Sequence, residues 1–157
     1  MDALAEQCAR EILDAVPLVM RFIRSHVRQH PVAGMALPQF RALSFLSRSA
    51  DASVSEVAGH LGVALPAMSR LVNDLVQRGW VHRQPVAGNR RQMALRLTRP
   101  GRIQLETMRA GIRRQLAERL TSLPVADRRN IRGGMQILRR AFEAGPDRKA
   151  DGGRKRS

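Results

Sequence analysis

The spacing of apolar residues changes at Gly79, from every third or fourth position to every second position. Before this glycine, the intervals 3–29, 38–48, 53–62 and 66–78 each carry an apolar stripe of helical spacing. After it, the intervals 80–83 and 92–97 are typical of β-strands, and helical spacing returns in 99–122 and 124–142. This order predicts a mainly α-helical fold with one small β-hairpin.

Turn and cap residues divide these segments. Pro17 predicts a kink or a break into two helices, because proline has no amide hydrogen. Ser53 and Glu56 have the spacing of a capping box, and Gly62 can end the helix that they begin. A turn-rich loop, 84–91, joins the two strands, of which the second is expected to turn Met93, Leu95 and Leu97 one way. Three short helices followed by a two-stranded wing form a winged helix-turn-helix.

The composition excludes several classes of protein. The 157 residues are 43% hydrophobic and 26% charged, which is ordinary for a globular protein and excludes global disorder. No run of about 18 apolar residues occurs, so we expect no membrane partner. Asp2 and Glu6 lie where a signal peptide would be positive, which favours the cytoplasm. Cys8, the single cysteine, excludes an intrachain disulfide and any multi-cysteine zinc site.

The net positive charge comes from the second part of the chain. The net charge is +15, yet residues 1–64 are balanced, and residues 65–102 set eight arginines against Asp74 alone. Arginine suits bidentate contacts with phosphate and guanine, so this charge nominates nucleic acid as a partner. A surface that only keeps an arginine-rich chain soluble is the alternative.

The interval 66–78 has the two faces of a recognition helix. Its outward face carries Pro66, Ala67, Ser69, Arg70, Asn73 and Gln77. In a major groove, Ser69 would bond a phosphate or a base edge, Arg70 would reach guanine, and Ala67 would contact a thymine methyl. Pro66, Ala67 and Asn73 would allow close approach. The alternative is a solvated polar face without a partner.

The hairpin supplies a second candidate contact. Arg90 and Arg91 lie near its tip, after the tight-turn residues Gly88 and Asn89. The negative potential of a minor groove attracts arginine, which predicts that this pair enters it. The alternative is an exposed arginine pair on a mobile loop.

The helices at both ends carry apolar stripes that a monomer of this size would struggle to cover. We expect them to pair with a second copy in a homodimer. The predicted domains are an N-terminal dimerisation helix and linker (1–36), a winged helix-turn-helix DNA-binding domain (37–102), C-terminal dimerisation helices (103–145) and a basic disordered tail (146–157).

Several segments in order resemble the MarR family of bacterial transcription regulators. They are Leu37-Pro38-Gln39-Phe40-Arg41-Ala42-Leu43, Val54-Ser55-Glu56-Val57-Ala58-Gly59-His60-Leu61-Gly62-Val63, Ser69-Arg70-Leu71-Val72-Asn73-Asp74-Leu75, Arg78-Gly79-Trp80-Val81 and Leu95-Arg96-Leu97-Thr98-Arg99-Pro100-Gly101-Arg102. The resemblance implies a homodimer that binds a palindromic operator in double-stranded DNA and usually represses nearby genes. Many members of the family release DNA when they bind small phenolic or aromatic acids.

The chain departs from the family pattern in its two DNA-contacting elements. Ala64 stands where the family commonly has Ser or Asp, and Ala67 where it has Thr. The wing segment 86–91 lacks both of the family's acidic residues, so at best Asn89 would brace a wing arginine. We therefore expect a more mobile wing, and the operator preference of relatives cannot be carried over to this chain.

Three effector hypotheses follow from single residues. Cys8 could sense oxidants, but the family's peroxide sensors use tyrosines, which this chain lacks, and Cys8 lies on an apolar stripe typical of a buried thiol. His26 and His30 have the spacing of two metal ligands on one helix face, although a core histidine is the commoner case. An aromatic acid would need apolar lining and a cation, for which the candidates are Met20, Phe22, Met35, Phe45, Arg21, Arg24 and Arg41. Ordinary packing explains each of these seven residues as well.

No catalytic motif accompanies these features. The chain has no glycine-rich phosphate loop, serine elbow or histidine–acid pair, so we expect neither an enzyme nor a cofactor. The competing class is an architectural or protein-binding module that uses the same fold without sequence specificity. Such a module would ignore operator symmetry, and its DNA binding would depend almost wholly on salt.

Overall fold

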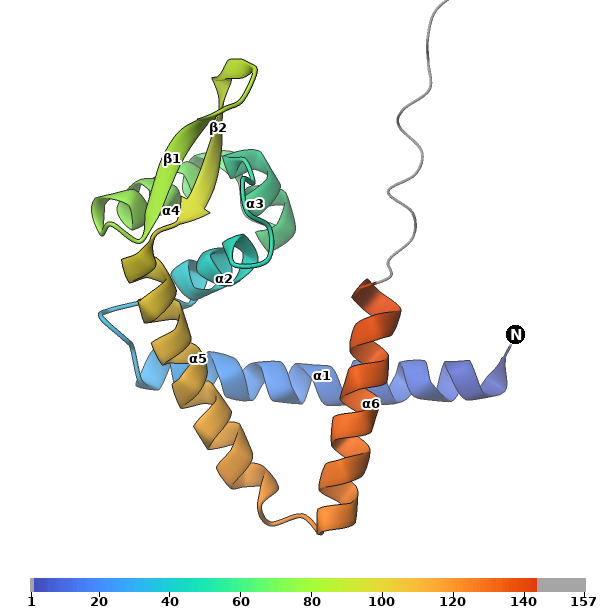
Figure 1. Cartoon of the computed structure of the whole chain (residues 1–157). Helices are drawn as coiled ribbons and strands as arrows, with labels where there is room; N and C mark the ends of the chain where they lie inside the picture. The colour runs from blue at the N-terminus through green and yellow to red at the C-terminus, as the bar shows by residue number, and fades with distance from the viewer. Residues whose placement is uncertain (1, 144–157) are drawn as a thin grey trace, which may run out of the picture. The chain divides into compact units, whose positions relative to one another are not determined.

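The structure, a computed structural model, describes residues 2–143, which form six helices and one two-stranded sheet (Figure 1). The elements are α1 (Ala3–Gln29), α2 (Leu37–Leu46), α3 (Val54–Leu61), α4 (Leu65–Gln77), β1 (Val81–Val86), β2 (Asn89–Leu97), α5 (Arg99–Leu120) and α6 (Val125–Glu143). The strands pair as one antiparallel hairpin. The predicted fold class, a winged helix-turn-helix flanked by helices, is confirmed. Among residues 2–143, no helix is long and apolar enough to cross a membrane.

The chain divides into two compact units within α5, one comprising residues 1–114 and the other beginning at Gln115. The predicted domain boundaries at 36/37 and 102/103 separate DNA-binding from dimerising segments, not compact units. They stay a prediction. The expected basic tail, 146–157, lies outside the described residues.

The core of the first unit lies among α2, α3, α4, the hairpin and the start of α5. Its fully buried large side chains include Leu43, Val57, Met68, Val72, Leu75, Val81, Leu95, Leu105 and Met108. Each side chain of this size contributes about 1.5–3 kcal/mol by leaving water. In Figure 1 the base of the hairpin crosses in front of α4, which contacts β1, and α2 lies below both.

The ends of α3 are fixed as the sequence predicts. The Ser53 Oγ accepts from the amide of Glu56 (3.1 Å), and the Glu56 carboxylate accepts from the amide of Ser53 (2.7 Å). Gly62 follows with φ 67°, a left-handed conformation that lacks a steric penalty only in glycine.

The structure corrects two expectations about α1. Of the two outcomes expected at Pro17, a kink or a break, the break does not occur, because the helix runs for 27 residues through this proline. Proline removes one hydrogen bond, and a helix of this length keeps the others on both sides. Cys8 is exposed rather than buried, because nothing else in the first unit covers the N-terminal part of α1.

The hairpin is longer than predicted. Pairing extends to Val86 opposite Asn89, which leaves a turn of only Ala87 and Gly88 in place of the predicted loop 84–91. Gly88 has φ 82°, which allows so tight a turn. Trp80 is buried but lies outside the strand.

The alternation predicted for β2 holds only near its end. Met93 is 37% exposed, whereas Leu95 and its neighbour Ala94 are both buried. The part of β2 before Ala94 is exposed throughout, because it extends past the core. Only the base of the hairpin has an apolar partner on one face.

The junction between the wing and α5 depends on a glycine. A Cβ atom on Gly101 would lie 2.0 Å from the carbonyl oxygen of Trp80. This distance is too short for two non-bonded atoms, so any residue with a side chain would force the backbone to shift. The Thr98 hydroxyl donates to the carbonyl of Gly79 and accepts from the amide of Gly101. The first turn of α5 is thereby fixed against the base of β1.

The α6 helix, in the second unit, buries none of its residues. Its apolar stripe is uncovered, with Ile131 39%, Met135 57% and Phe142 74% exposed. Hydrophobic side chains in such a row mark a surface that lacks its partner.

Candidate nucleic-acid interface

The sequence-predicted residues of α4 lie on its outward side. Pro66, Arg70 and Asn73 are exposed, and Ala67 and Ser69 are half-buried. The helix begins with Ala64 at its N-cap, which makes no side-chain cap hydrogen bond, as its methyl group requires. The first turn therefore keeps amide N–H groups that no side chain of the cap residue satisfies.

Asp74, the one acidic residue in 65–102, is directed away from this polar face. Its carboxylate accepts from the Gln39 amide of α2 and from the Arg78 Nε (3.0 Å). Arg78 also donates to the carbonyl of Ala33 (3.1 Å) and lies over the Trp80 ring, 5.0 Å from its centroid. The single negative charge of the region thus holds α4 to α2 and leaves the outer face of α4 without an acid.

A contact between α4 and the wing was not predicted. The Arg83 Nη2 of β1 donates to the Asn73 Oδ1 of α4 over 2.5 Å. No feature of the sequence pairs these two residues, because they lie ten positions apart and on different elements. Sequence reasoning placed Asn73 on the surface but missed Arg83.

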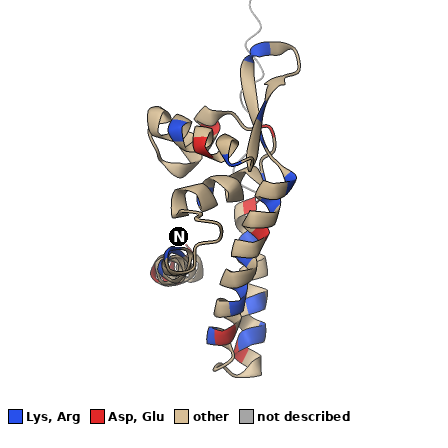
Figure 2. Ribbon diagram, turned by 90° about the vertical axis from the view of Figure 1, so that its left-hand side faces the viewer, with Lys and Arg blue, Asp and Glu red and all other residues tan. Residues whose placement is uncertain are grey.

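Arg90 and Arg91 are exposed and follow the turn after Asn89. Figure 2 shows basic positions on the ribbon at the tip of the hairpin. The Asn89 Oδ1 accepts from the backbone amide of Arg91 (3.2 Å). The Asn89 side chain was expected, at best, to brace the side chain of a wing arginine, but it holds the backbone of Arg91 instead. This bond steadies the turn and leaves both guanidinium groups exposed to solvent.

The base of the wing is braced by Asp51, a residue that sequence reasoning did not single out. Both carboxylate oxygens of Asp51 accept from the Arg96 guanidinium at 2.5 Å, and Gln84 donates to one of them at 3.0 Å. The hydrogen bond from Arg96 is the main cause that lowers the pKa of Asp51. An adjacent backbone bridge from Leu95 to Ala52 (2.8 Å) ties the same loop to β2.

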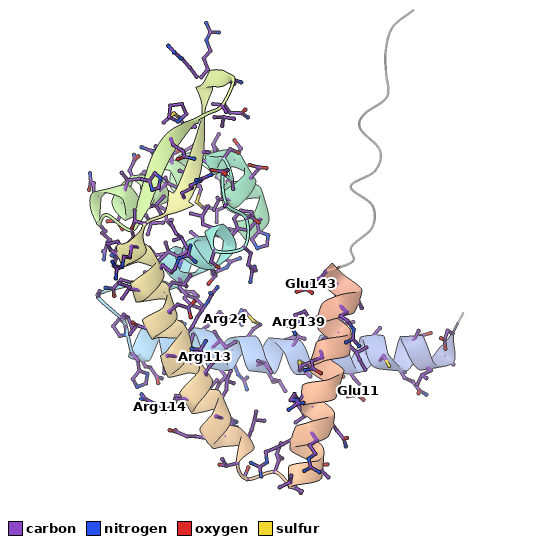
Figure 3. The ribbon with its side chains drawn as sticks, in the orientation of Figure 1. Glu11, Arg24, Arg113, Arg114, Arg139 and Glu143 are labelled. Carbon is purple, nitrogen blue, oxygen red and sulfur yellow. The ribbon has the colours of Figure 1, made fainter. Side chains whose placement is uncertain are left out.

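The histidines considered as metal ligands lie side by side but without further ligands. The His26 and His30 rings stack with centroids 4.6 Å apart. Across residues 2–143, no three His, Cys, Asp or Glu side chains gather as a metal site would require. His26 is buried against Gly111 of α5, and burial, then the charges of His30 and Arg114 (labelled in Figure 3), lower its pKa.

The residues considered for an effector have varied surroundings. Met35 is buried, Met20 is 40% exposed, and Phe45 stacks on His60 with ring centroids 4.4 Å apart. The Arg41 guanidinium donates to the carbonyl of Leu61 (3.2 Å). These contacts give Phe45 and Arg41 structural partners, and an effector site stays a prediction.

The fold and the acid-free polar face of α4 beside an arginine-tipped wing define a winged helix-turn-helix protein. Residues 33–92 match the family model described as the MarR family. This stretch is thus similar to the MarR family, which agrees with the sequence resemblance. Two curated relatives are HTH-type transcriptional regulators of Mycobacterium bovis and Mycobacterium tuberculosis, each 26% identical over 138 residues, which are 88% of this chain and 96% of the relative.

Solved structures share the fold. RV1404 of Mycobacterium tuberculosis superposes with a TM-score of 0.71 at 23% identity, over 95% of this chain and all of the other. Wild-type MarR of E. coli gives 0.66 at 21% identity, over 83% of this chain and 95% of the other. A Mycobacterium tuberculosis MarR family protein in complex with salicylic acid gives 0.61 at 24% identity, over 81% and 92%.

Proposed function

We propose that this chain is a homodimeric transcription regulator, and most simply a repressor, that binds a palindromic operator through α4 and the wing. The observation that carries the proposal is the outward face of α4, which bears Ser69, Arg70 and Asn73 and has its one acid turned inward. Names of the curated relatives, which are transcriptional regulators, agree with this role. A regulator of this kind needs no catalytic group, and we assign none.

In the proposed complex, each α4 enters a major groove. Ser69 and Arg70 make base and phosphate contacts, while Pro66, Ala67 and Asn73 allow close approach. Arg90 and Arg91 enter the flanking minor groove. The two-fold axis of the dimer then sets half-sites about one helical turn apart.

The proposed domains divide this work. Residues 37–102 bind DNA, and the flanking segments 1–36 and 103–145 join two copies through the uncovered apolar residues of α1 and α6. Leu4 and Leu13 of α1 are 67% and 72% exposed in the single chain. The stripe residues of α6 are exposed as well. Such rows of exposed leucines and aromatics are what a second copy would cover.

A small aromatic acid is the effector class that we propose for release from DNA. A fold neighbour at 24% identity is a MarR family protein in complex with salicylic acid, which supports the class of ligand but not its site here. The effect would be a shift between two spacings of the DNA-binding lobes, with a coupling of roughly 1–3 kcal/mol.

The test is a fluorescence-anisotropy titration of the full chain against the region upstream of its own gene and a scrambled duplex of equal length, each at two salt concentrations. A specific dimer is expected to prefer the upstream duplex by about a thousandfold with two chains per site. Equal affinity for both duplexes, falling together as salt rises, would favour the non-specific architectural module.

The matching variant is Arg70→Ala. We expect it to cost about 1–3 kcal/mol in operator binding and to relax preference at one base pair. Uniform weakening on all duplexes would mean that Arg70 contacts phosphate only.

A further inference from the structure

The carboxamide of Asn73 has an acceptor end and a donor end, and the end that faces outward decides what it can recognise. Arginine carries only N–H donors, so Arg83 can meet Asn73 only at the Oδ1. The Arg83 Nη2 lies 2.5 Å from that oxygen. The contact therefore directs the NH2 group of Asn73 away from the wing as its available end.

The hairpin places Arg83 for this contact. Arg83 lies two residues after buried Val81 and opposite buried Leu95, so by the two-residue period of a strand it shares their inward face. This face packs against α4 at the base of the hairpin. Beyond Val81 the apolar core ends, and the next inward side chain, Arg83, meets the polar side of α4 instead.

Nearby acids do not compete for Arg83. Asp74 accepts from Gln39 and Arg78, and Asp51 accepts from Arg96 and Gln84. Among the described residues, Arg83 takes part in no salt bridge. A neutral oxygen, the Asn73 Oδ1, is thus the acceptor for a full positive charge.

We infer that Arg83 is a positioning residue that turns Asn73 into a hydrogen-bond donor and so sets a base preference within each half-site; this rests on the proposed function. An unrestrained asparagine pairs with adenine, accepting from N6 and donating to N7. The bond from Arg83 occupies one of the two lone pairs of the Asn73 Oδ1 and turns this oxygen toward the wing. The N–H groups of Asn73 are therefore the ones that face outward, beside the donors of Arg70 one turn away. Guanine, whose O6 and N7 both accept, fits that donor pattern, and adenine N6 does not.

The test is selection from a random-sequence duplex library by the full-length chain, followed by sequencing. Wild type is expected to enrich a two-fold symmetric motif with guanine at the pair that Asn73 contacts. In Arg83→Ala, the freed oxygen accepts from adenine N6, and the preference for guanine over adenine at that one pair falls about tenfold. Arg83→Lys keeps a cationic donor and keeps the preference.

Two further variants separate positioning from folding. Asn73→Asp still holds Arg83, now as an ion pair, but lacks the donor, so guanine preference at the same pair is lost. Arg99→Ala removes an exposed arginine at the start of α5 and should change no position of the motif. Thermal unfolding of each variant checks that the chain folds.

Two outcomes would overturn the inference, and they are distinguishable. If Arg83→Ala weakens all duplexes equally and keeps the wild-type motif, Arg83 contacts phosphate or only supports the fold. If wild type itself enriches no motif, the proposed sequence-specific function fails, and the inference fails with it.

Discussion

Asp51 and Asp74 are each engaged by an arginine, Arg96 and Arg78 respectively. Exposed ion pairs of this kind contribute about 0–1 kcal/mol to stability, so their main effect is on orientation. Asp74 holds α4 against α2, and Asp51 holds the base of the wing to the loop before α3. At the scale of single residues, the two carboxylates are held by neighbouring side chains, so the outer face of α4 and the wing tip carry no acid.

The lowered pKa of His26 predicts that the fold loses stability in acid. Burial, His30 and Arg114 lower its pKa below the ordinary 6.5, so the folded chain resists protonation while the unfolded chain does not. As pH falls below 6.5, the unfolded state takes up the proton first, and the free energy of unfolding falls until the lowered pKa is reached. The slope for one such proton cannot exceed about 1.4 kcal/mol per pH unit.

The measurement is urea unfolding of wild type and His26→Gln between pH 7.5 and pH 5, a range chosen around the ordinary histidine pKa of about 6.5. The variant should lose part of the wild-type slope, because glutamine binds no proton. His60→Gln, on α3, is measured alongside, so that a change of slope seen only in His26→Gln is assigned to His26 and not to the loss of a histidine in general. Identical slopes for wild type and His26→Gln would contradict the prediction.

At the scale of elements, the wing and α5 are joined through one close approach. The first turn of α5 lies against the carbonyl of Trp80, where only the absence of a side chain at Gly101 leaves room. Thr98 bridges the two segments with a bond on each side. This junction fixes how the base of the hairpin leaves the core.

Gly101→Ala is expected to destabilise the chain by about 1–3 kcal/mol, because its Cβ would overlap the Trp80 backbone, which cannot rotate aside. Thermal or urea unfolding measures the loss. The control is Gly59→Ala in α3, where nothing lies within 4 Å of the added Cβ and better helix propensity should stabilise by about 0.5–1 kcal/mol. Equal stability of the Gly101 variant and wild type would refute the close approach.

At the scale of the whole molecule, two properties extend over many residues. The net charge of +15 favours polyanions at long range and makes DNA association depend on salt. The uncovered stripe of α6 favours a second copy, because a row of exposed apolar side chains is unfavourable in water. The first property draws the chain to DNA of any sequence, and the second would give it two-fold symmetry.

Met135→Glu should shift the chain from dimer to monomer, since a charge would enter an apolar interface. Sedimentation equilibrium measures the mass, and operator affinity should fall as the dimer is lost. Gln136→Glu is the control, because the helical spacing places Gln136 away from the stripe of Ile131 and Met135. A Met135→Glu chain that keeps the mass and DNA affinity of wild type would exclude α6 from the dimer interface.

Much of the architecture follows from the sequence, because local signals decide it. The change of period at Gly79, the capping box of Ser53 and Glu56, and Gly62 each act within a few residues, and the structure confirms them. The exposure of the α4 face also follows from helical spacing alone. Which of its residues contact DNA is still a prediction.

What only the tertiary structure decided depends on contacts between distant segments. Of the kink or break expected at Pro17, the break does not occur, because helix length outweighs the local propensity of proline. Cys8 is exposed, because no other described segment of the first unit covers this part of α1. The sequence by itself determined the order of elements and the location of charge, since both are properties of neighbouring residues. The orientation of Asn73 by Arg83 and the bracing of Asp51 by Arg96 had to await the fold, because hydrogen bonds between side chains leave no periodic signature in a sequence.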